Sequence, residues 1–231
     1  MGIGAILIDA GGTLLAEHPS REALYATVAA IRGTEISPQE MRGCMLAAHR
    51  ALPQEIGGNY RYTVPWFEAF IAHVFSRQLG LAESKLPELC AELFATFADA
   101  KNYRLTEGAR ELLDGARASG LKLCLISNWS PAMTTVLGGL GILGHFDVVL
   151  ISALERVEKP DRAIFERALG RLNVLAREAL HVGNEPVQDV RGASDCGIHT
   201  LLFDPANRHA ALSLASIHRL AEVIPWIEKQ R

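Results

Sequence analysis

Hydrophobic residues along this chain follow two patterns, which change near residue 102. Between residues 21 and 101 the apolar positions recur at helical spacing and few segments alternate like strands. This pattern predicts helices over residues 21–31, 38–51, 64–79 and 86–98. Ser37, Pro38 and Glu40 mark the start of the second helix as a serine cap, a proline in the first turn and a glutamate that bonds back to the cap. Gly57-Gly58-Asn59 interrupts the series before the third helix.

After Thr106, short and nearly all-apolar segments alternate with amphipathic helices. The strands are predicted at residues 122–126, 147–150, 179–182 and 200–203. The helices between them are predicted at residues 107–118, 132–140, 163–172 and 187–196. Strands that are apolar on both faces are typical of a parallel sheet covered by helices on each side. We therefore expect an α/β fold with a doubly wound, Rossmann-like parallel sheet.

The apolar run Ile6-Leu7-Ile8 belongs to the same sheet, although it stands near the start of the chain. It leads into Asp9 and the glycine-rich turn Ala10-Gly11-Gly12. The core domain is therefore predicted from residues 1–16 and 102–231, and residues 17–101 form an inserted, all-helical cap domain. Open α/β sheets bind ligands at the carboxyl ends of their strands, so we expect the cap to cover those ends.

The charge balance argues against several classes of partner. The chain has 231 residues, with 23 Lys and Arg against 26 Asp and Glu, and a net charge of −3. It has no basic footprint for nucleic acid and no polybasic or bilayer-spanning segment for a membrane. The four cysteines are widely spaced and fit reduced thiols. The first residues lack a signal-peptide pattern, so we expect a cytoplasmic protein that acts on a small molecule.

Polar residues follow four of the predicted strands in a specific order. In chain order they are Asp9 and Thr13, then Ser127 and Asn128, then Lys159, and finally Asn184 with Asp189. A carboxylate such as Asp9 can attack phosphorus or an activated carbon and form a covalent intermediate that water then hydrolyses. The Lys159 ammonium suits an anionic substrate and is expected to keep Asp9 ionised.

This order of motifs resembles that of the haloacid dehalogenase superfamily of hydrolases. The resemblance covers essentially the whole chain, including the helical insertion between the first and second motifs. It implies catalytic roles for Asp9, Thr13, Ser127 and Lys159, and binding of a small anionic substrate by Gly12, Ser127, Asn128 and Lys159. In phosphatases of this family Mg²⁺ is held by the nucleophile, a backbone carbonyl two residues later and acids of the fourth motif. Here those positions are Asp9, the Gly11 carbonyl, Asn184 and Asp189.

Two positions depart from the family pattern. Gly11 stands where the family usually has a second aspartate, and it cannot protonate a leaving group, a contribution of typically about 10²–10⁴-fold in rate. Asn184 replaces an aspartate of the fourth motif and removes one negative charge, for which the adjacent Glu185 is not expected to compensate. We therefore expect Mg²⁺ to bind weakly or not at all, and phosphate ester hydrolysis to be slow unless the leaving group is good.

Several other residues have two interpretations each. Asp189 fits either the site or the first turn of a helix, where the helix dipole favours an acid. Trp129 fits either a substrate pocket or packing, and His18 fits either a substitute acid or an ordinary surface histidine. His181 and His199 are predicted to be core histidines. A patch in the cap could set specificity, although packing alone explains Trp66; it comprises Tyr60, Arg61, Tyr62 and Trp66.

Three functions remain open at this point. The leading one is a hydrolase of a small phosphorylated metabolite that works through Asp9 with reduced catalytic power. The second is a metal-independent 2-haloacid dehalogenase, which the pairing of Gly11 with Asn184 favours, although only Arg42 and Arg50 offer loose candidates for its substrate-binding arginine. The third is a binding protein that retains the fold and has lost turnover. The substrate and the oligomeric state are not specified by the sequence.

Overall fold

The computed structural model describes residues 2–230, and within them the chain forms two compact units. The α/β unit comprises residues 2–16, Arg104–Trp129 and 141–230. The helical unit comprises Glu17–Tyr103 and Ser130–Leu140. Two short strands, β2 (Leu15–Glu17) and β5 (Tyr103–Leu105), pair where the chain passes from one unit to the other. Residues 130–140, which the sequence pattern assigns to the core domain, group with the helical unit.

The α/β unit is built on a six-stranded sheet in the order β10-β9-β8-β1-β6-β7. All neighbouring strands run parallel, and β1 lies between β6 and β8. The strands are β1 (Ala5–Asp9), β6 (Lys122–Ser127), β7 (Val148–Ile151), β8 (Ala179–Gly183), β9 (His199–Phe203) and β10 (Ser216–Ile217). This arrangement confirms the predicted doubly wound α/β fold.

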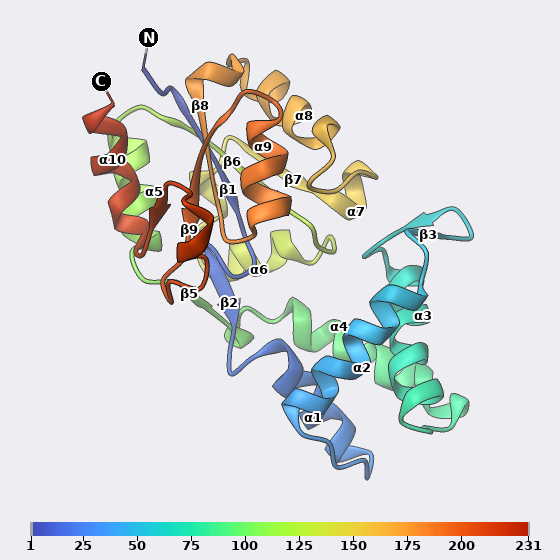
Figure 1. The fold of residues 1–231 in the computed structure, drawn as a ribbon. Helices are drawn as coiled ribbons and strands as arrows, with labels where there is room; N and C mark the ends of the chain where they lie inside the picture. Colours follow the sequence, from blue (N-terminus) through green and yellow to red (C-terminus); the bar gives the residue numbers. More distant parts are fainter. Residues whose placement is uncertain (1, 231) are drawn as a thin grey trace. The chain divides into compact units, whose positions relative to one another are not determined.

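Helices cover both faces of this sheet. Figure 1 shows α5 (Ala109–Ala118) and α10 (Val223–Lys229) on one face, and α8 (Arg162–Leu172) and α9 (Gly192–Ser194) on the other. Alternate residues of each strand enter each layer: Leu7 and Cys124 pack with Phe165 of α8 in one buried cluster. The short α7 (Ser152–Glu155) follows β7, and the π-helical turn η6 (Pro186–Arg191) joins β8 to α9. The sheet core thus fixes the carboxyl ends of β1, β6 and β8.

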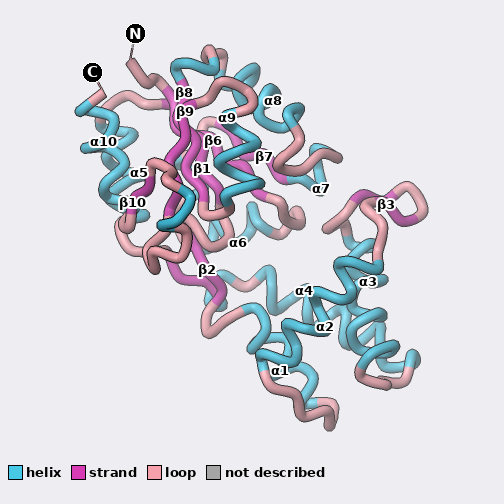
Figure 2. Tube along the Cα trace, in the orientation of Figure 1, coloured by secondary structure: helices cyan, strands magenta, loops and turns pink. Residues whose placement is uncertain are grey.

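The helical unit has its own apolar core. Its elements are α1 (Arg21–Ile31), α2 (Pro38–Ala51), α3 (Val64–Ala72), the π-helical continuation η1 (His73–Gln78), α4 (Leu86–Ala98) and α6 (Met133–Gly139). The predicted start of α2 is confirmed, because Ser37 and Glu40 form a reciprocal capping box. The expectation that this segment is all helical is wrong at one place: Glu55–Ile56 and Asn59–Tyr60 pair as a small antiparallel hairpin, β3–β4, across the predicted break (Figure 2).

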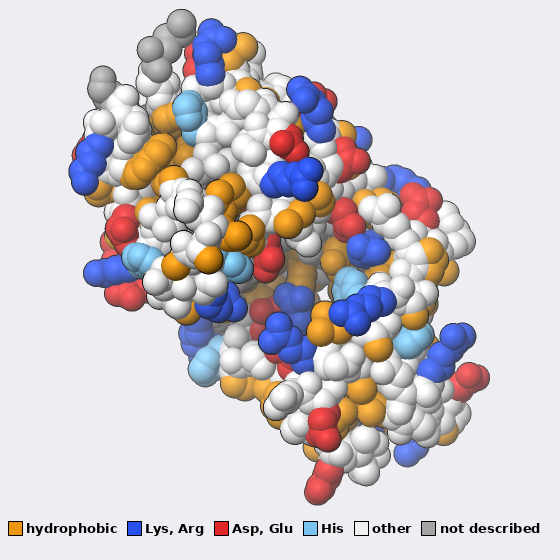
Figure 3. Space-filling model, in the orientation of Figure 1, with side chains coloured by type: hydrophobic (Ala, Val, Ile, Leu, Met, Phe, Trp, Pro, Cys, Tyr) orange, Lys and Arg blue, Asp and Glu red, His pale blue; other side chains and the backbone are white. Residues whose placement is uncertain are grey.

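Two further features concern the helices and the surface charge. Within residues 2–230 no helix is both long enough and apolar enough to cross a membrane. On the face drawn in Figure 3, basic and acidic side chains are interspersed, as the nearly balanced charge of the sequence predicts.

Candidate active site

Three parallel strands end side by side at the candidate site. Asp9 is the last residue of β1, Ser127 is the last of β6, and Gly183 is the last of β8. The register places Asp9 beside Ile126, so Ser127 lies one residue beyond that pair. Asp9 and Ser127 are both buried. Residues far apart in the chain therefore meet because β1 lies between the two other strands.

Lys159 is the residue that links these strand ends. Its Nζ lies 2.5 Å from Asp9 Oδ1 and 2.7 Å from Asp189 Oδ1. The Lys159 side chain is 2% exposed, and those of Asp9 and Asp189 are 10% and 1% exposed. A buried ammonium between two carboxylates leaves one net negative charge in the cluster. We call these three residues the charge cluster.

The environment moves the pKa values of the two carboxyls in opposite directions. Burial raises the pKa of Asp9 to about 6, an effect that Lys159 opposes and Asp189 reinforces. Burial acts on Asp189 in the same sense, but Lys159 and His181 outweigh it and hold the pKa of Asp189 well below its usual range. Lys159 therefore favours the ionised form of Asp9, as expected, although the attraction of the ammonium does not fully offset the burial of this carboxyl.

The Asp189 carboxylate is fully engaged by protein donors. Its Oδ1 accepts from Lys159 Nζ and from His181 Nε2, and its Oδ2 accepts from the Glu185 backbone N–H at 3.0 Å. The turn η6 brings it back against the end of β8, where a Cβ on Gly183 would lie only 2.2 Å from Asp189 Cγ. Gly183 is therefore required by this packing.

His181 is a member of the site that the sequence pattern misassigned. It was expected to be an ordinary core histidine, but its Nε2 lies 3.0 Å from Asp189 Oδ1 with both side chains 1% exposed. Burial lowers the pKa of His181. One feature could have indicated its role. His181 stands in the strand β8, which is wholly buried, and a buried polar side chain needs a hydrogen-bond partner. The expectation for His199 is also wrong, because that residue is exposed.

Thr13 and Gly12, in the turn after β1, both lie against the side chain of Asn184. Thr13 is fully buried, and its Oγ1 donates to Asn184 Oδ1 at 3.1 Å. Gly12 adopts φ +80°, and a Cβ at this position would lie 2.9 Å from Asn184 Nδ2. The Thr13 carbonyl accepts from the Thr106 hydroxyl, which fixes the turn from its other side. The first and fourth motifs are thus tied together by one hydrogen bond and one close approach.

Asn128 is placed against the backbone of Lys159. Its Nδ2 donates to the Lys159 carbonyl at 2.9 Å, and its Oδ1 accepts from the Lys159 N–H at 2.9 Å. Nδ2 also lies 3.2 Å from Gln188 Oε1. The amide therefore orients the loop that carries Lys159, which is a different task from the predicted contact with substrate. The neighbouring Trp129 is buried, and its backbone N–H donates to the Ser152 hydroxyl.

The residues expected to hold Mg²⁺ fit that ion in part. Asp9, the Gly11 carbonyl and Asn184 offer oxygen ligands, the kind Mg²⁺ prefers. Asp189 fits less well, because both of its oxygens already accept hydrogen bonds. Glu185 is exposed and contributes its backbone N–H to Asp189. Among residues 2–230 no group of three or more His, Cys, Asp or Glu side chains is arranged to hold a metal ion.

The other candidate residues lie in the helical unit. His18 is exposed, as a surface histidine would be. Trp66 is fully buried and its Nε1 donates to the Pro53 carbonyl at 2.8 Å, so packing accounts for it. Tyr60 is also buried, whereas Arg61 and Tyr62 are half-buried. The proposed specificity patch is therefore reduced to the last two of these residues.

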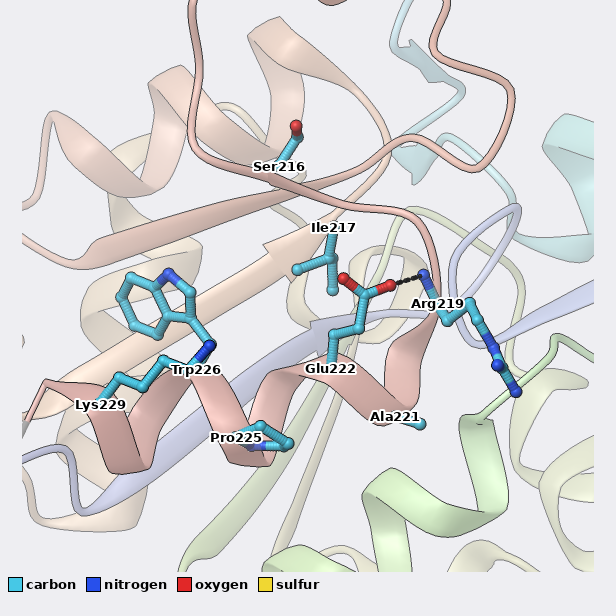
Figure 4. Close-up of a pocket in the computed structure, with 8 residues that line it drawn as sticks. All are labelled: Ser216, Ile217, Arg219, Ala221, Glu222, Pro225, Trp226 and Lys229. Carbon is cyan, nitrogen blue, oxygen red and sulfur yellow. Dashed lines mark hydrogen bonds between the residues drawn. The ribbon is translucent and has the colours of Figure 1, made fainter.

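A surface hollow in the α/β unit includes none of the strand-end residues. It lies over α10 and β10 and is drawn in Figure 4. Its lining residues are Ser216, Ile217, Arg219, Ala221, Glu222, Pro225, Trp226 and Lys229. Arg219 there pairs with Glu107 at 2.9 Å, and both side chains are exposed. The chemistry of the strand ends therefore does not extend into this hollow.

Comparisons with known proteins bear on the class of this site. The family model of haloacid dehalogenase-like hydrolases matches residues 3–197. The chain is 29% identical over 232 residues to haloacid dehalogenase-like hydrolase domain-containing protein 3 of Homo sapiens, over 95% of this chain and 92% of that protein. It is 32% identical over 219 residues to a phosphoserine phosphatase of Thermus thermophilus, over 86% of this chain and 88% of that protein.

A solved structure extends the similarity at the level of the fold. The crystal structure of a 2-haloacid dehalogenase from Pseudomonas syringae pv. Tomato superposes with a TM-score of 0.70, at 21% identity, over 99% of both chains. Proteins named as a phosphatase and as a dehalogenase are thus both similar to this chain. The choice between the two chemistries rests on the residues of the site.

Proposed function

Because the chain belongs to the haloacid dehalogenase-like hydrolase family and is a hydrolase, we propose that it hydrolyses a small phosphorylated metabolite through a covalent intermediate on Asp9. The observation that supports this most directly is the charge cluster, in which a buried lysine bridges a strand-end aspartate to a second carboxylate. The similarity to a phosphatase of Thermus thermophilus favours a phosphate ester as substrate. Such a substrate is anionic, which suits a site with a buried ammonium.

The proposed reaction has two displacement steps. One carboxylate oxygen of Asp9 attacks phosphorus, an Asp9–phosphate bond forms, and the ester P–O bond breaks to release an alkoxide, which takes a proton from water or from an acid group of the substrate. Water then attacks the phosphorus of this intermediate, which releases inorganic phosphate and restores the Asp9 carboxylate. Lys159 and Ser127 would stabilise the phosphoryl oxygens during both steps. Asp9 Oδ1 bonds to Lys159 Nζ, so the second carboxylate oxygen is our candidate nucleophile.

The raised pKa of Asp9 suits this role. A carboxyl with a pKa of about 6 is mostly ionised at neutral pH and is more basic than an ordinary aspartate. Its basicity comes first from burial, and Lys159 and Asp189 set the value by opposing effects. Asn128 acts on the reaction through Lys159, because its amide bonds to the Lys159 backbone. Asp189 acts through its bond to the Lys159 ammonium and through its charge, which raises the pKa of Asp9.

Gly11 and Asn184 set the expected limits of the activity. No side chain at position 11 can protonate the departing alcohol, so the substrate needs a good leaving group or an acid of its own. Asp9, the Gly11 carbonyl and Asn184 are the residues that would hold Mg²⁺, and a bound Mg²⁺ would neutralise charge on the phosphoryl oxygens. With one carboxylate among these three ligands, we expect the affinity for Mg²⁺ to be low.

A second candidate is metal-independent removal of halide from a 2-haloacid. Gly11 and Asn184 favour it, because a halide leaves without an acid and the reaction does not need Mg²⁺. In that reaction Asp9 would attack carbon and form an ester, which water would hydrolyse. The same charge cluster would serve, so these two hypotheses differ in substrate and metal requirement rather than in nucleophile.

One set of assays separates the two candidates. Activated and natural phosphate esters are assayed with Mg²⁺ and with EDTA, and halide release from 2-haloacids is assayed without metal. Asp9→Asn is the control for every assay, because its amide is a poor nucleophile of almost the same shape. Turnover of phosphate esters above this control supports the proposed function. Halide release without phosphate release would replace it by the second candidate.

Restoring the missing acid provides a sharper test. We expect Gly11→Asp to raise Mg²⁺-dependent hydrolysis of alkyl phosphates by at least about tenfold, because it adds the proton donor that the site lacks. The gain should be smaller for p-nitrophenyl phosphate, whose leaving group needs little protonation. Gly11→Asn is the matched control for size. A folded Gly11→Asp protein with no gain on alkyl phosphates would show that acid catalysis is not the limiting element.

A further inference from the structure

His181 is a buried titratable residue to which neither the motifs nor the proposed mechanism gives a task. It is the third residue of β8, and its side chain is 1% exposed. Its Nε2 lies 3.0 Å from Asp189 Oδ1. A carboxylate without a proton can only accept a hydrogen bond, so the shared hydrogen belongs to His181 Nε2. His181 therefore donates to the carboxylate that anchors Lys159.

The surroundings of the ring argue against a role in packing alone. Phe165 stands edge-on to the imidazole, with ring centroids 5.3 Å apart and planes at 87°. The other ring nitrogen, Nδ1, is buried and has no hydrogen-bond partner among residues 2–230. An apolar side chain would fill this space without leaving a buried acceptor unpaired. The hydrogen bond to Asp189 is thus the one contact that only a polar side chain could make.

The position of Lys159 depends on how Asp189 is satisfied. Lys159 divides its hydrogen bonds between Asp9 at 2.5 Å and Asp189 at 2.7 Å. Asp189 Oδ1 has two donors, Lys159 and His181, while Oδ2 has the Glu185 N–H. Without His181, Lys159 would be the remaining donor on Oδ1, and a buried carboxylate with fewer donors attracts its cation more strongly. The ammonium would then shift from Asp9 toward Asp189.

We infer that His181 is a positioning residue: its Nε2–H holds Asp189 so that Lys159 stays shared with the nucleophile Asp9. The inference rests on the proposed function, because it assumes that Asp9 and Lys159 act on the substrate. It does not place His181 on the substrate or on a metal ion. His181 acts in sequence through Asp189 and Lys159.

Two substitutions at position 181 test this role. His181→Leu fills the space but removes the donor, and His181→Gln keeps an N–H at a similar reach. For p-nitrophenyl phosphate we expect His181→Leu to lower kcat about tenfold, with KM changed less than about threefold, because a misplaced ammonium weakens the transition state most. His181→Gln should retain kcat within about threefold of the wild type. Leu180→Val, a buried change in the same strand, controls for lost packing and should leave kcat unchanged.

A spectroscopic measurement keeps the test independent of turnover. Proton–nitrogen correlation spectra of imidazole-labelled protein at pH 7 should show the His181 proton on Nε2. This signal should move in Asp189→Asn and remain in place in Asp9→Asn. If the wild type turns over none of the tested esters, the proposed function fails and the spectra still decide the hydrogen bond.

Two results would overturn the inference. The first is a His181→Leu protein with wild-type kcat and KM, which would reduce His181 to packing. The second is a proton on Nδ1 instead of Nε2, or a His181 signal that does not respond to Asp189→Asn. Equal losses of kcat in His181→Leu and His181→Gln would also contradict it, because rescue by a second N–H donor is what the geometry requires.

Discussion

The two units of this protein bury different kinds of side chain. The α/β unit places Asp9, Lys159 and Asp189 out of solvent, held by short hydrogen bonds. The helical unit buries aromatic rings: Trp66 stacks on Phe70 with centroids 5.6 Å apart, and other rings meet them edge-on. Ring contacts are many and weak, so losing one reduces stability gradually. Lys159 is the indispensable member of the charge cluster, because its loss leaves two buried carboxylates without their cation.

This contrast predicts that the stability lost on substitution depends on pH in a different way in the two units. Removing the cation of the charge cluster should destabilise the protein by an amount that changes when the carboxyls are protonated. Breaking aromatic packing that does not involve a titrating side chain should cost the same free energy at each pH. The predictions below test that difference, beginning with the largest effect.

Removing the shared cation should have the largest effect. Lys159→Met should abolish turnover and lower the free energy of unfolding at pH 7 by about 3–5 kcal/mol, because two carboxylates lose their buried partner. The deficit should shrink at pH 5, where protonation neutralises the carboxyls. Urea unfolding at both pH values measures it. Phe75→Ala in the helical unit is the control, with a loss of about 3–5 kcal/mol that does not depend on pH, because Phe75 stacks on Tyr25. A Lys159→Met deficit that is equal at both pH values would contradict the comparison.

Neutralising the nucleophile should stabilise the fold. The pKa of Asp9 rises from 3.8 to about 6 in the folded protein, so the folded state holds the Asp9 proton more tightly than the unfolded state. Stability is therefore lost as pH rises from about 4 through 6, by up to about 3 kcal/mol at 1.4 kcal/mol per pKa unit. Asp9→Asn escapes this loss. In EDTA it should unfold at higher urea concentration than the wild type at pH 7.5, while turnover disappears.

The same comparison at pH 4 supplies the check on Asp9. There the carboxyl is protonated in the folded wild type, so the two proteins should differ little in stability. Asp195→Asn changes an exposed carboxyl and should leave stability within about 0.5 kcal/mol at either pH. An Asp9→Asn protein less stable than the wild type at pH 7.5 would mean that burial does not dominate the pKa of Asp9.

Adding one methyl group should have opposite effects in the two units. In Gly183→Ala the new Cβ would lie 2.2 Å from Asp189 Cγ, so the carboxylate must move. We expect a loss of about 1–3 kcal/mol in unfolding free energy and a large loss of turnover. In Gly138→Ala, on α6, the Cβ meets no atom within 4 Å, and helix propensity predicts a gain of about 0.5 kcal/mol. Thermal unfolding and kcat of both variants test this contrast, and retained activity in Gly183→Ala would contradict the placement of Asp189.

The smallest effect concerns the histidine among the rings of the helical unit. His49 lies 5.3 Å from the Trp66 centroid, and burial, then Arg61 and Arg21, lower its pKa from 6.5 to about 4. Unfolding below pH 6.5 therefore takes up a proton, so His49 reduces stability as pH falls toward 4. Because the ring is half-buried, solvent screening limits the effect to about 1 kcal/mol between pH 7 and pH 5. His49→Phe should flatten the fall in Tm over this range, and His18→Phe, at an exposed site, should not.

The sequence predicted the sheet better than the site. The sequence pattern locates β6, β7, β8 and β9 within one or two residues, because strands that are apolar on both faces appear as short hydrophobic runs between amphipathic helices. The sequence pattern predicts no element after residue 203, where the structure forms β10 and α10. These elements are short, and Pro225 within α10 obscures the helical pattern.

The sequence predicts which residues belong to the candidate site, but it does not predict which of them contact one another. Asp9 and Lys159 could be proposed from the order of the motifs, but no spacing reveals that one ammonium bonds to both Asp9 and Asp189. The family resemblance implies that Asn128 binds the substrate. Its bonds to the Lys159 backbone depend on two loops 31 residues apart in sequence, which only the folded chain brings together.

In the π-helical turn η6, the number of residues in the fourth motif determines where the Asp189 side chain points. A π-helix completes a turn over more residues than an α-helix does, and here the Val190 N–H donates back to the Glu185 carbonyl, five residues earlier. Deleting any one residue between Glu185 and Asp189 would rotate the following side chains by about 100° around the helix axis. An aspartate would still be present in the sequence, but its carboxylate would face away from Gly183 and Lys159. Deleting one residue from this turn should therefore remove the carboxylate from the site as effectively as replacing Asp189 itself.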